Sequence, residues 1–172
     1  MMKSVGKLTV RTGLADEQLT SKAASRLHFL EQLKRSGAGR RDLLCFYTTI
    51  IRPVLEYACP VWHSSLTAAQ SRALESIQRR AMRIIYDDDD DYMLPLILAS
   101  LDTLESRRAQ LTKRFFKRNV LPESSYLHYL LPERRDAAVT GRLRRARTFE
   151  PLIIRTVKFR NSFIPHCLSN FD

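Results

Sequence analysis

The chain has 172 residues, of which 44% are hydrophobic, so a packed core can form over part of its length. Its 29 lysines and arginines exceed its 18 acidic residues by 11 charges, a balance that favours polyanions, chiefly nucleic acid, as partners. It contains only five glycines, and its three cysteines (Cys45, Cys59 and Cys167) form no CxxC pair. This composition argues against glycine-rich phosphate loops, a disulfide framework and a cysteine-type zinc site.

The first predicted helix follows a weakly patterned start. Residues 1–20 are expected to form a loosely ordered N-terminal segment, although a helical pattern begins near Glu17. Small and apolar side chains then recur at three- and four-residue steps as far as Arg35. They are Leu19, Ala23, Leu27, Leu30 and Leu33. Gly37 follows as a predicted left-handed cap that ends the helix.

The next two helices carry clear local markers. One is predicted over residues 41–56, and we expect a kink or break near Arg52 because Pro53 has no backbone N–H to donate. The other begins with a capping box formed by Thr67 and Gln70 and continues to about residue 86. Its apolar positions repeat with helical spacing, so it is the most clearly predicted element in the chain.

The chain changes character after the third helix. An unbroken run of five aspartates, Asp87–Asp91, is expected to form a solvated loop. A fourth helix is predicted over residues 102–119, with basic residues along one face. From residue 132 to 172, nine basic residues outnumber four acidic ones and the periodicity is poor. This last stretch therefore resembles an extended basic tail.

These elements predict an all-α fold: a small helical bundle of about four main helices followed by an extended basic C-terminal tail. The expected divisions are residues 1–20, a helical domain over 21–86, an acidic loop with further helices over 87–131, and the tail over 132–172. No apolar stretch approaches the roughly 20 residues of a membrane-spanning helix, and no signal-peptide pattern is present. We therefore expect an intracellular protein with no membrane partner.

Arginines are the leading candidates for a functional site. At about 100° per residue, Arg72, Arg79 and Arg83 share one face of the third helix, and three arginines share a face of the fourth. Such faces can track a phosphate backbone, although each one alone is also typical of an ordinary solvated helix. The predicted nucleic-acid-binding residues are Arg72, Arg79, Arg80, Arg83, Arg107, Arg114, Arg118, Arg142, Arg144, Arg145 and Arg147.

The sequence predicts no catalytic site, metal site or cofactor. Consecutive aspartates do not converge from separate elements, as two-metal catalysis requires. Cys59 and His63 lie four residues apart, but no second pair completes a zinc site. The GxSxG, GxxxxGK[ST] and HExxH motifs are all missing from the sequence. Tyr47, Tyr57 and Trp62 could stack on bases, but their apolar neighbours favour a role in the core.

Several blocks of the sequence, taken in order, resemble the region that follows the polymerase palm in non-LTR (LINE-type) retrotransposon reverse transcriptases, with jockey-like and chicken-repeat-like elements closest. The longest block is FYTTIIRPVLEYACPVWH, residues 46–63. It is preceded by RLHFL (26–30) and LKRSG (33–37) and followed by LESIQRRAMRII (74–85) and LDTLESRR (101–108). The ending FRNSFIP (159–165) is similar to the C-terminus of such reading frames. The resemblance covers about residues 21–172.

The resemblance implies a thumb-like domain at residues 21–86 that packs against a template–primer duplex, with the basic tail gripping RNA or target DNA. It implies RNA, DNA or an RNA–DNA duplex as partners, together with the missing palm domain of the parent polymerase, and a nuclear location. The Tyr/Phe-Ala-Asp-Asp motif that carries the family's chemistry does not occur in this sequence. We therefore expect a truncated reverse-transcriptase fragment that is not an enzyme.

Two alternatives stay open. One is a helical protein-interaction module whose arginines only keep it in solution. The other is a chain labelled by similarity to the N-terminal region of an AlkB-homologue dioxygenase, without that enzyme's catalytic residues. The iron site of such an enzyme needs a His-x-Asp pair. None of His28, His63, His128 and His166 has an aspartate two residues later.

Overall fold

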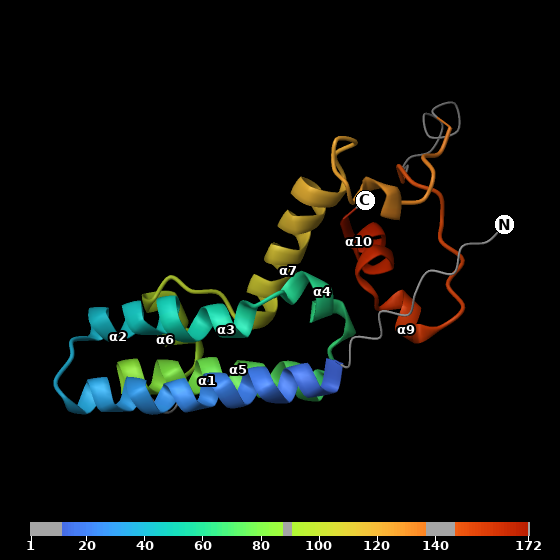
Figure 1. Cartoon of the computed structure of the whole chain (residues 1–172). Helices are drawn as coiled ribbons and strands as arrows, with labels where there is room; N and C mark the ends of the chain where they lie inside the picture. The colour runs from blue at the N-terminus through green and yellow to red at the C-terminus, as the bar shows by residue number, and fades with distance from the viewer. Residues whose placement is uncertain (1–11, 88–90, 137–146, 172) are drawn as a thin grey trace.

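The computed structural model describes residues 12–87, 91–136 and 147–171, and their side chains from residue 20 onward. The fold is all-α, as predicted, and in these ranges the strand-like pairing is one isolated antiparallel bridge between Arg134 and Phe149. Figure 1 shows a long helical bundle from the N-terminal half and a smaller C-terminal group beside one end of it. None of the described helices is both long enough and apolar enough to cross a membrane.

Helix α1 (Thr12–Arg35) begins earlier than the sequence predicted, so residues 12–20 are helical rather than loosely ordered. Gly13 costs little at the very start of a helix, and the residues that follow it include good helix formers. The helix ends as predicted, because Gly37 has a φ of 88° and the Ala38 N–H donates to the Leu33 carbonyl in the last turn. Residues 1–11 lie outside the described part, so the expectation for them stays a prediction.

The second predicted helix follows one continuous path with an irregular middle. Helix α2 (Arg40–Phe46) passes into the π-helical segment η1 (Tyr47–Ile51) and then into α3 (Arg52–Glu56). The wider π turns come just before Pro53, which cannot donate a hydrogen bond to the preceding turn. The sequence therefore located the irregularity correctly, and the chain accommodates it with a π segment.

A short corner leads from α3 to the main helix. It consists of α4 (Cys59–Trp62) and the 3-10 turn η2 (His63–Ser65). Helix α5 (Ala68–Tyr86) then begins with the predicted capping box. The backbone N–H of Gln70 donates to Thr67 Oγ1 at 3.2 Å, and the backbone N–H of Thr67 donates to Gln70 Oε1 at 2.8 Å.

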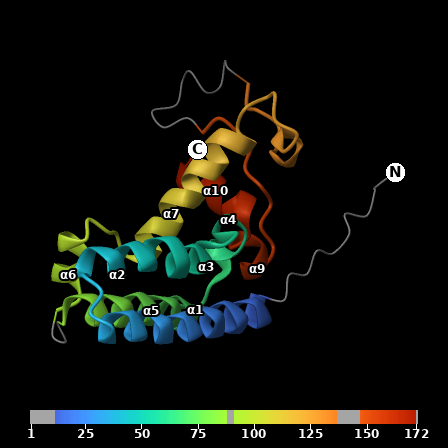
Figure 2. The same cartoon turned by 60° about the vertical axis from the view of Figure 1, so that its left-hand side comes forward.

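A first hydrophobic cluster lies where α1, the α2–η1–α3 path and α5 meet. Figures 1 and 2 both show α1 and α5 side by side along the length of the bundle. Apolar burial is the main favourable term that holds such a bundle together. The buried members of the cluster are Ala23, Leu27, Leu30, Leu43, Tyr47, Ile51, Leu55, Cys59, Trp62, Leu74, Ile77, Ala81, Met82, Ile85, Leu96 and Leu104.

A polar network crosses the first cluster, formed by Tyr47, Gln78, Tyr92, Glu75 and the backbone of Asp102. Tyr47 Oη donates to Gln78 Oε1 at 2.5 Å. Gln78 Nε2 donates to Tyr92 Oη at 3.0 Å and to the Asp102 carbonyl at 2.9 Å, and Tyr92 donates to the Glu75 carboxylate. Burial raises the pKa of both phenols, so they stay protonated donors.

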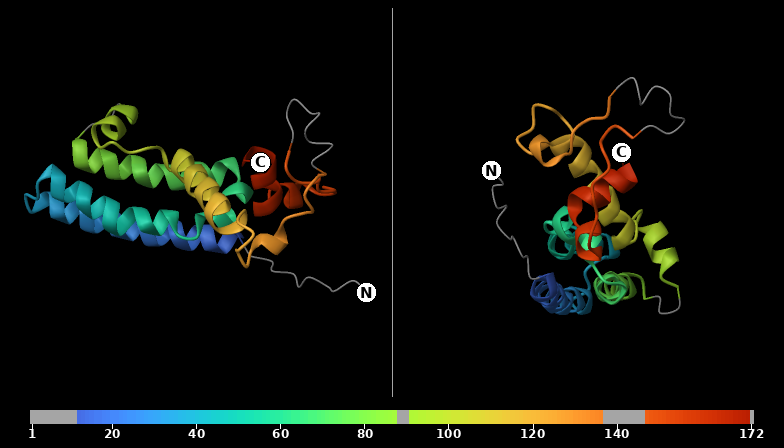
Figure 3. Two further views of the ribbon diagram at one scale, coloured as in Figure 1. Left: turned by 90° about the horizontal axis from the view of Figure 1, so that it is seen from above. Right: turned by 90° about the vertical axis from the view of Figure 1, so that its right-hand side faces the viewer.

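Beyond α5 the chain forms α6 (Met93–Leu98) and then α7 (Leu104–Phe115), which continues as the π-helical segment η3 (Phe116–Val120). Together α7 and η3 confirm the predicted fourth helix. Thr103 caps its start, because the Ser106 N–H donates to Thr103 Oγ1 at 3.2 Å. Figure 3 shows α7 lying obliquely across the bundle on its way to the C-terminal group.

The C-terminal region is not simply the extended tail that was predicted. It contains the 3-10 turn η4 (His128–Leu130), the single turn α9 (Val157–Arg160) and α10 (Phe163–Phe171). Within the predicted tail, the stretch from Arg147 to Thr156, before α9, contains no helix. Helix α10 folds back because its apolar residues recur with helical spacing and can be buried. The second cluster contains Phe116, Val120, Phe149, Cys167 and Leu168.

The two clusters meet along one helix. Leu111 of α7 packs against the first cluster, whereas Phe115 packs against the second. The division between the two cores therefore runs through the last turn of α7. One helix thus contributes side chains to both cores, and the domain boundaries expected after residues 86 and 131 stay predictions.

Candidate nucleic-acid interface

The outer face of α5 carries four exposed arginines, which are Arg72, Arg79, Arg80 and Arg83. The helix contains a single acidic residue, Glu75, and this carboxylate is turned inward. It accepts from Tyr92 and from the backbone N–H groups of Leu104 and Glu105 at 3.2 and 3.3 Å. The backbone of the first turn of α7 therefore donates hydrogen bonds to Glu75, the only acid of α5, and the outer face of α5 is basic.

The α5 arginines differ in how firmly they are held. The guanidinium of Arg79 lies 4.9 Å from the ring centroid of Tyr92, a cation–π distance that orients it without neutralising it. Arg80 forms an ion pair with Glu31 of α1 at 2.8 Å, and this pair lowers the pKa of Glu31. Arg72 forms no ion pair with another described residue. The ion pair with Glu31 therefore partly compensates the charge of Arg80.

The arginines predicted on the fourth helix divide into two kinds. Arg107 is half-buried and pairs with Glu56 at 3.3 Å, a carboxylate that also accepts from Arg52 at 2.6 Å. Arg114 and Arg118 are exposed, and neither pairs with an acid in the described part of the chain. Arg107 therefore joins α7 to α3, and only Arg114 and Arg118 present full charges to solvent.

The structure does not merge the α5 and α7 arginines into one continuous row. Helix α7 touches α5 through its first turns, where Glu75 meets Leu104 and Ser71 meets Arg108. At about 1.5 Å per residue, Arg114 and Arg118 lie about 9 and 15 Å along the helix from Arg108, the nearer of these contacts. The two sets form separate basic patches, which we call the α5 patch (Arg72, Arg79, Arg80 and Arg83) and the α7 patch (Arg114 and Arg118).

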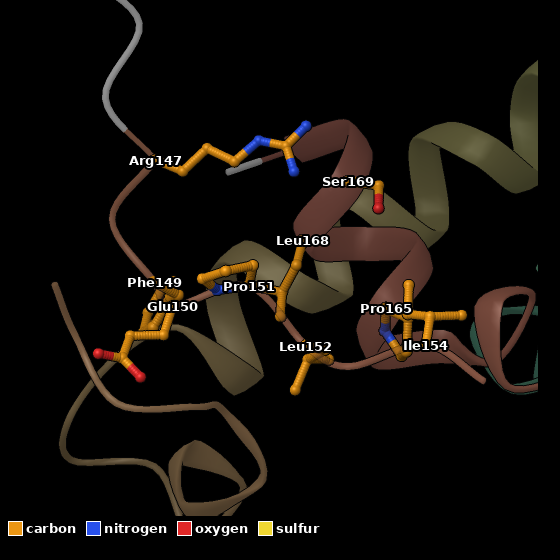
Figure 4. A pocket seen from close by; sticks show the side chains of 9 residues that line it. All are labelled: Arg147, Phe149, Glu150, Pro151, Leu152, Ile154, Pro165, Leu168 and Ser169. Atoms are coloured by element: carbon orange, nitrogen blue, oxygen red, sulfur yellow. The ribbon is translucent and has the colours of Figure 1, made fainter. Parts of the chain in front are cut away.

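Of the predicted tail arginines, Arg147 is the one that falls within the described part, and it is exposed. Arg142, Arg144 and Arg145 lie outside the described residues and stay predictions. Figure 4 shows Arg147 extending over α10 toward Ser169, above a hollow of about 90 Å³. This volume lies well below the roughly 300 Å³ of typical ligand sites, so the hollow is too small for a typical ligand.

Arg108 is a residue that the sequence interpretation missed. It is fully buried, its Nη2 donates to Ser71 Oγ at 2.9 Å, and its guanidinium lies 6.0 Å from the ring centroid of Trp62. The signal was its spacing, since Arg108 lies four residues after Leu104 and three before Leu111, on the apolar face of the predicted helix. Arg108 therefore belongs to the junction of α4, α5 and α7 rather than to a surface that binds phosphate.

The aspartate run behaves as a loop where it is described. Asp87 and Asp91 are exposed. Asp87 accepts from Lys34, and Asp91 Oδ1 accepts from the Met93 N–H at 2.7 Å, so both help to order the turn between α5 and α6. Residues 88–90 lie outside the described part. Within the described ranges, no group of three or more His, Cys, Asp or Glu side chains is arranged to hold a metal ion.

The three aromatic candidates for base stacking differ in how deeply they are buried. Tyr47 and Trp62 are buried in the first cluster, as their apolar neighbours indicated, whereas Tyr57 is 71% exposed. Trp62 Nε1 donates to the Tyr57 carbonyl at 2.9 Å, which satisfies the indole inside the core. Only Tyr57 of these three is therefore accessible for stacking on a base.

A pH effect follows from His63, which is half-buried beside Arg108 and His166. Burial and these two neighbours lower the pKa of His63 to about 4. Between pH 6.5 and 4 the unfolded chain therefore binds a proton that the folded chain does not, and stability falls as the pH falls. We expect His63→Gln to remove about 2 kcal/mol of this loss, a value reduced because the ring is partly exposed.

Urea unfolding at pH 7 and pH 4.5 tests this expectation, with His28→Gln on the exposed side of α1 as the control. Burial also lowers the pKa of His166, so part of the pH dependence persists in the His63 variant. An unchanged loss of stability between the two pH values in His63→Gln would contradict the assignment to His63.

Comparisons of the whole chain with protein-family models, with curated proteins and with solved structures find no match, so the interface is described by its own geometry.

Proposed function

We propose that the chain binds duplex nucleic acid without catalysing a reaction, in the manner of the thumb region of a non-LTR retrotransposon reverse transcriptase. The observation that carries this proposal is the α5 patch: four exposed arginines on a helix whose only acid faces inward. From Arg72 to Arg83 the helix rises by about 16 Å, a length that faces several phosphates of a nucleic-acid strand.

Two further features support the proposal. The α7 patch adds a second set of exposed arginines near the C-terminal group, and the exposed Lys117 lies between its two members in the sequence. The chain as a whole carries an excess of 11 positive charges, which attracts any polyanion and speeds its encounter. Nucleic acid is the partner that this charge fits best. The resemblance adds a nuclear location and a polymerase palm as the protein partner.

A salt titration tests the proposed interface. The triple variant Arg72→Gln, Arg79→Gln and Arg83→Gln removes three charges and keeps much of the side-chain bulk. Each phosphate contact contributes about 0.9 to the slope of log K against log salt, so we expect the slope for an RNA–DNA duplex to fall by about 2 to 3. Fluorescence anisotropy at several salt concentrations measures it.

The matched control removes three charges elsewhere, through Lys22→Gln, Arg35→Gln and Arg41→Gln on the exposed surfaces of α1 and α2. If both triple variants weaken binding equally, the chain attracts nucleic acid by overall charge alone and the α5 patch is not the interface. If the unaltered chain shows no salt-dependent binding at low salt, the proposed function is wrong. Primer extension by the purified chain would contradict its non-catalytic part.

One observation favours a second function, a helical protein-interaction module. Helix α6 leaves Met93, Leu94, Ile97 and Leu98 exposed, and only Pro95 and Leu96 are buried. A contiguous apolar patch of this kind is typical of a surface that another protein covers. A partner protein that covers the α6 residues and stays bound at high salt would support this function, since apolar contacts do not weaken as ionic strength rises.

A further inference from the structure

An apolar groove of about 450 Å³ lies where α4, α7, η4, α9 and α10 meet, and we call it the seam groove. Its volume falls within the roughly 300–1,000 Å³ of typical ligand sites. Three of its lining residues stay open to solvent: Val61 is 57% exposed, and Leu130 and Phe159 are each 42% exposed. Contiguous exposed apolar surface of this kind marks a binding site more often than an idle surface.

Part of the groove wall is fixed by aromatic packing. The ring of Phe163 meets Phe115 edge-on, with centroids 5.8 Å apart, and also meets Phe116 at 6.3 Å. Because Phe116 is fully buried in the second cluster, Phe163 is tied to a rigid core. Phe159, on the single turn α9, supplies a more exposed ring to the same groove. The groove wall therefore presents planar aromatic rings to a ligand, and the wall does not have to rearrange first.

The α9 side of the seam groove is basic. Lys158 and Arg160 flank Phe159 in the chain, Arg155 lies just before α9, and all three are exposed. None of them pairs with an acid in the described part, and no Asp or Glu occurs between residues 151 and 171. Arg114 of the α7 patch directly precedes Phe115 of the groove wall. Charge complementarity therefore favours a ligand that combines a flat apolar part with several anionic groups.

We propose that the seam groove holds an unpaired base of a nucleic acid whose duplex part lies on the arginine patches. This inference rests on the proposed function and adds a single-strand site to it. Aromatic side chains stack on any base, so such a site tolerates many sequences. The basic residues are distributed along residues 155–160 and α7 rather than gathered at one point. This distribution suits a chain of phosphates better than the single head group of a lipid.

Binding of two matched ligands tests the inference. One is a blunt RNA–DNA duplex, and the other is the same duplex with four unpaired nucleotides at one end and 2-aminopurine at the first unpaired position. Stacking of one base is expected to make the second ligand bind about tenfold more tightly than the first. It is also expected to quench the 2-aminopurine fluorescence when the complex forms.

The Phe159→Ala variant is expected to lose both the tenfold preference and the quenching while it keeps the affinity for the blunt duplex. Phe159→Trp, which restores a stacking ring, is expected to keep both. The control Phe29→Ala removes an exposed ring from α1, outside the groove, and is expected to behave as the unaltered chain does. Rescue by Trp separates loss of stacking from local disruption of α9.

Three outcomes overturn the inference. Equal affinity for the two duplexes rejects the seam groove while leaving the arginine interface intact. Failure to bind either duplex rejects the interface and the groove together. If sodium oleate binds the chain, and Phe159→Ala abolishes that binding without changing the preference for the unpaired end, the groove holds an acyl chain instead.

Discussion

Replacing Arg108 by alanine is expected to lower the free energy of unfolding by about 3 to 5 kcal/mol. Arg108 is among the largest fully buried side chains, and it joins α7 to Ser71 of α5 and to the Trp62 ring of α4. Alanine would leave a cavity at the junction of three helices and remove the donor to Ser71. Urea unfolding followed by circular dichroism measures the change.

Two companion variants separate the causes. Arg114→Ala, at an exposed site on the same helix, is expected to change stability by less than about 0.5 kcal/mol. Arg108→Met keeps most of the volume without the charge and is expected to recover most of the lost stability, because apolar replacements for buried charges are often tolerated. If Arg108→Met is as unstable as Arg108→Ala, the charged hydrogen bond rather than the packing holds the junction.

The Phe116→Ala substitution is expected to cost about 3 to 5 kcal/mol as well, but within the second cluster. Phe116 is fully buried there and contacts Phe163 of α10. The first cluster has its own larger set of buried side chains and does not include Phe116. We therefore expect α9 and α10 to detach while α1 and α5 stay folded.

Hydrogen exchange resolved by peptide measures this difference. Peptides from residues 147–171 should lose protection in Phe116→Ala, whereas peptides from α1 and α5 should keep it. Phe159→Ala, at a partly exposed site, is the control and should retain protection in both regions. Simultaneous loss of protection in α1 and α10 would show that the two clusters unfold as one cooperative unit.

The sequence predicted best the features that depend on neighbouring residues. The capping box of Thr67 and Gln70 and the glycine at residue 37 act within one helical turn, so their chemistry is visible in the chain itself. The irregularity before Pro53 follows from a single missing donor. Each of these predictions is confirmed because no distant contact had to be known.

Features that depend on distant contacts were harder to predict. Arg107 and Arg108 are adjacent basic residues, but one pairs with Glu56 near the surface and the other is fully buried. A helical projection separates the two by only about 100° and does not say which direction another helix will cover. The folded α10 was missed for a related reason, because the basic residues before it obscured its apolar spacing. Which arginines bind phosphate stays a prediction.

The polar network inside the first cluster has a consequence for the outside of α5. A slip of one residue along α5 would turn the helix by about 100° and exchange the surroundings of adjacent side chains. Arg79 would then take the place of Gln78 between Tyr47 and the Asp102 carbonyl, where its extra length and charge do not fit. The buried amide of Gln78 therefore fixes how α5 is rotated about its own axis, and with it the direction in which the arginines of α5 point.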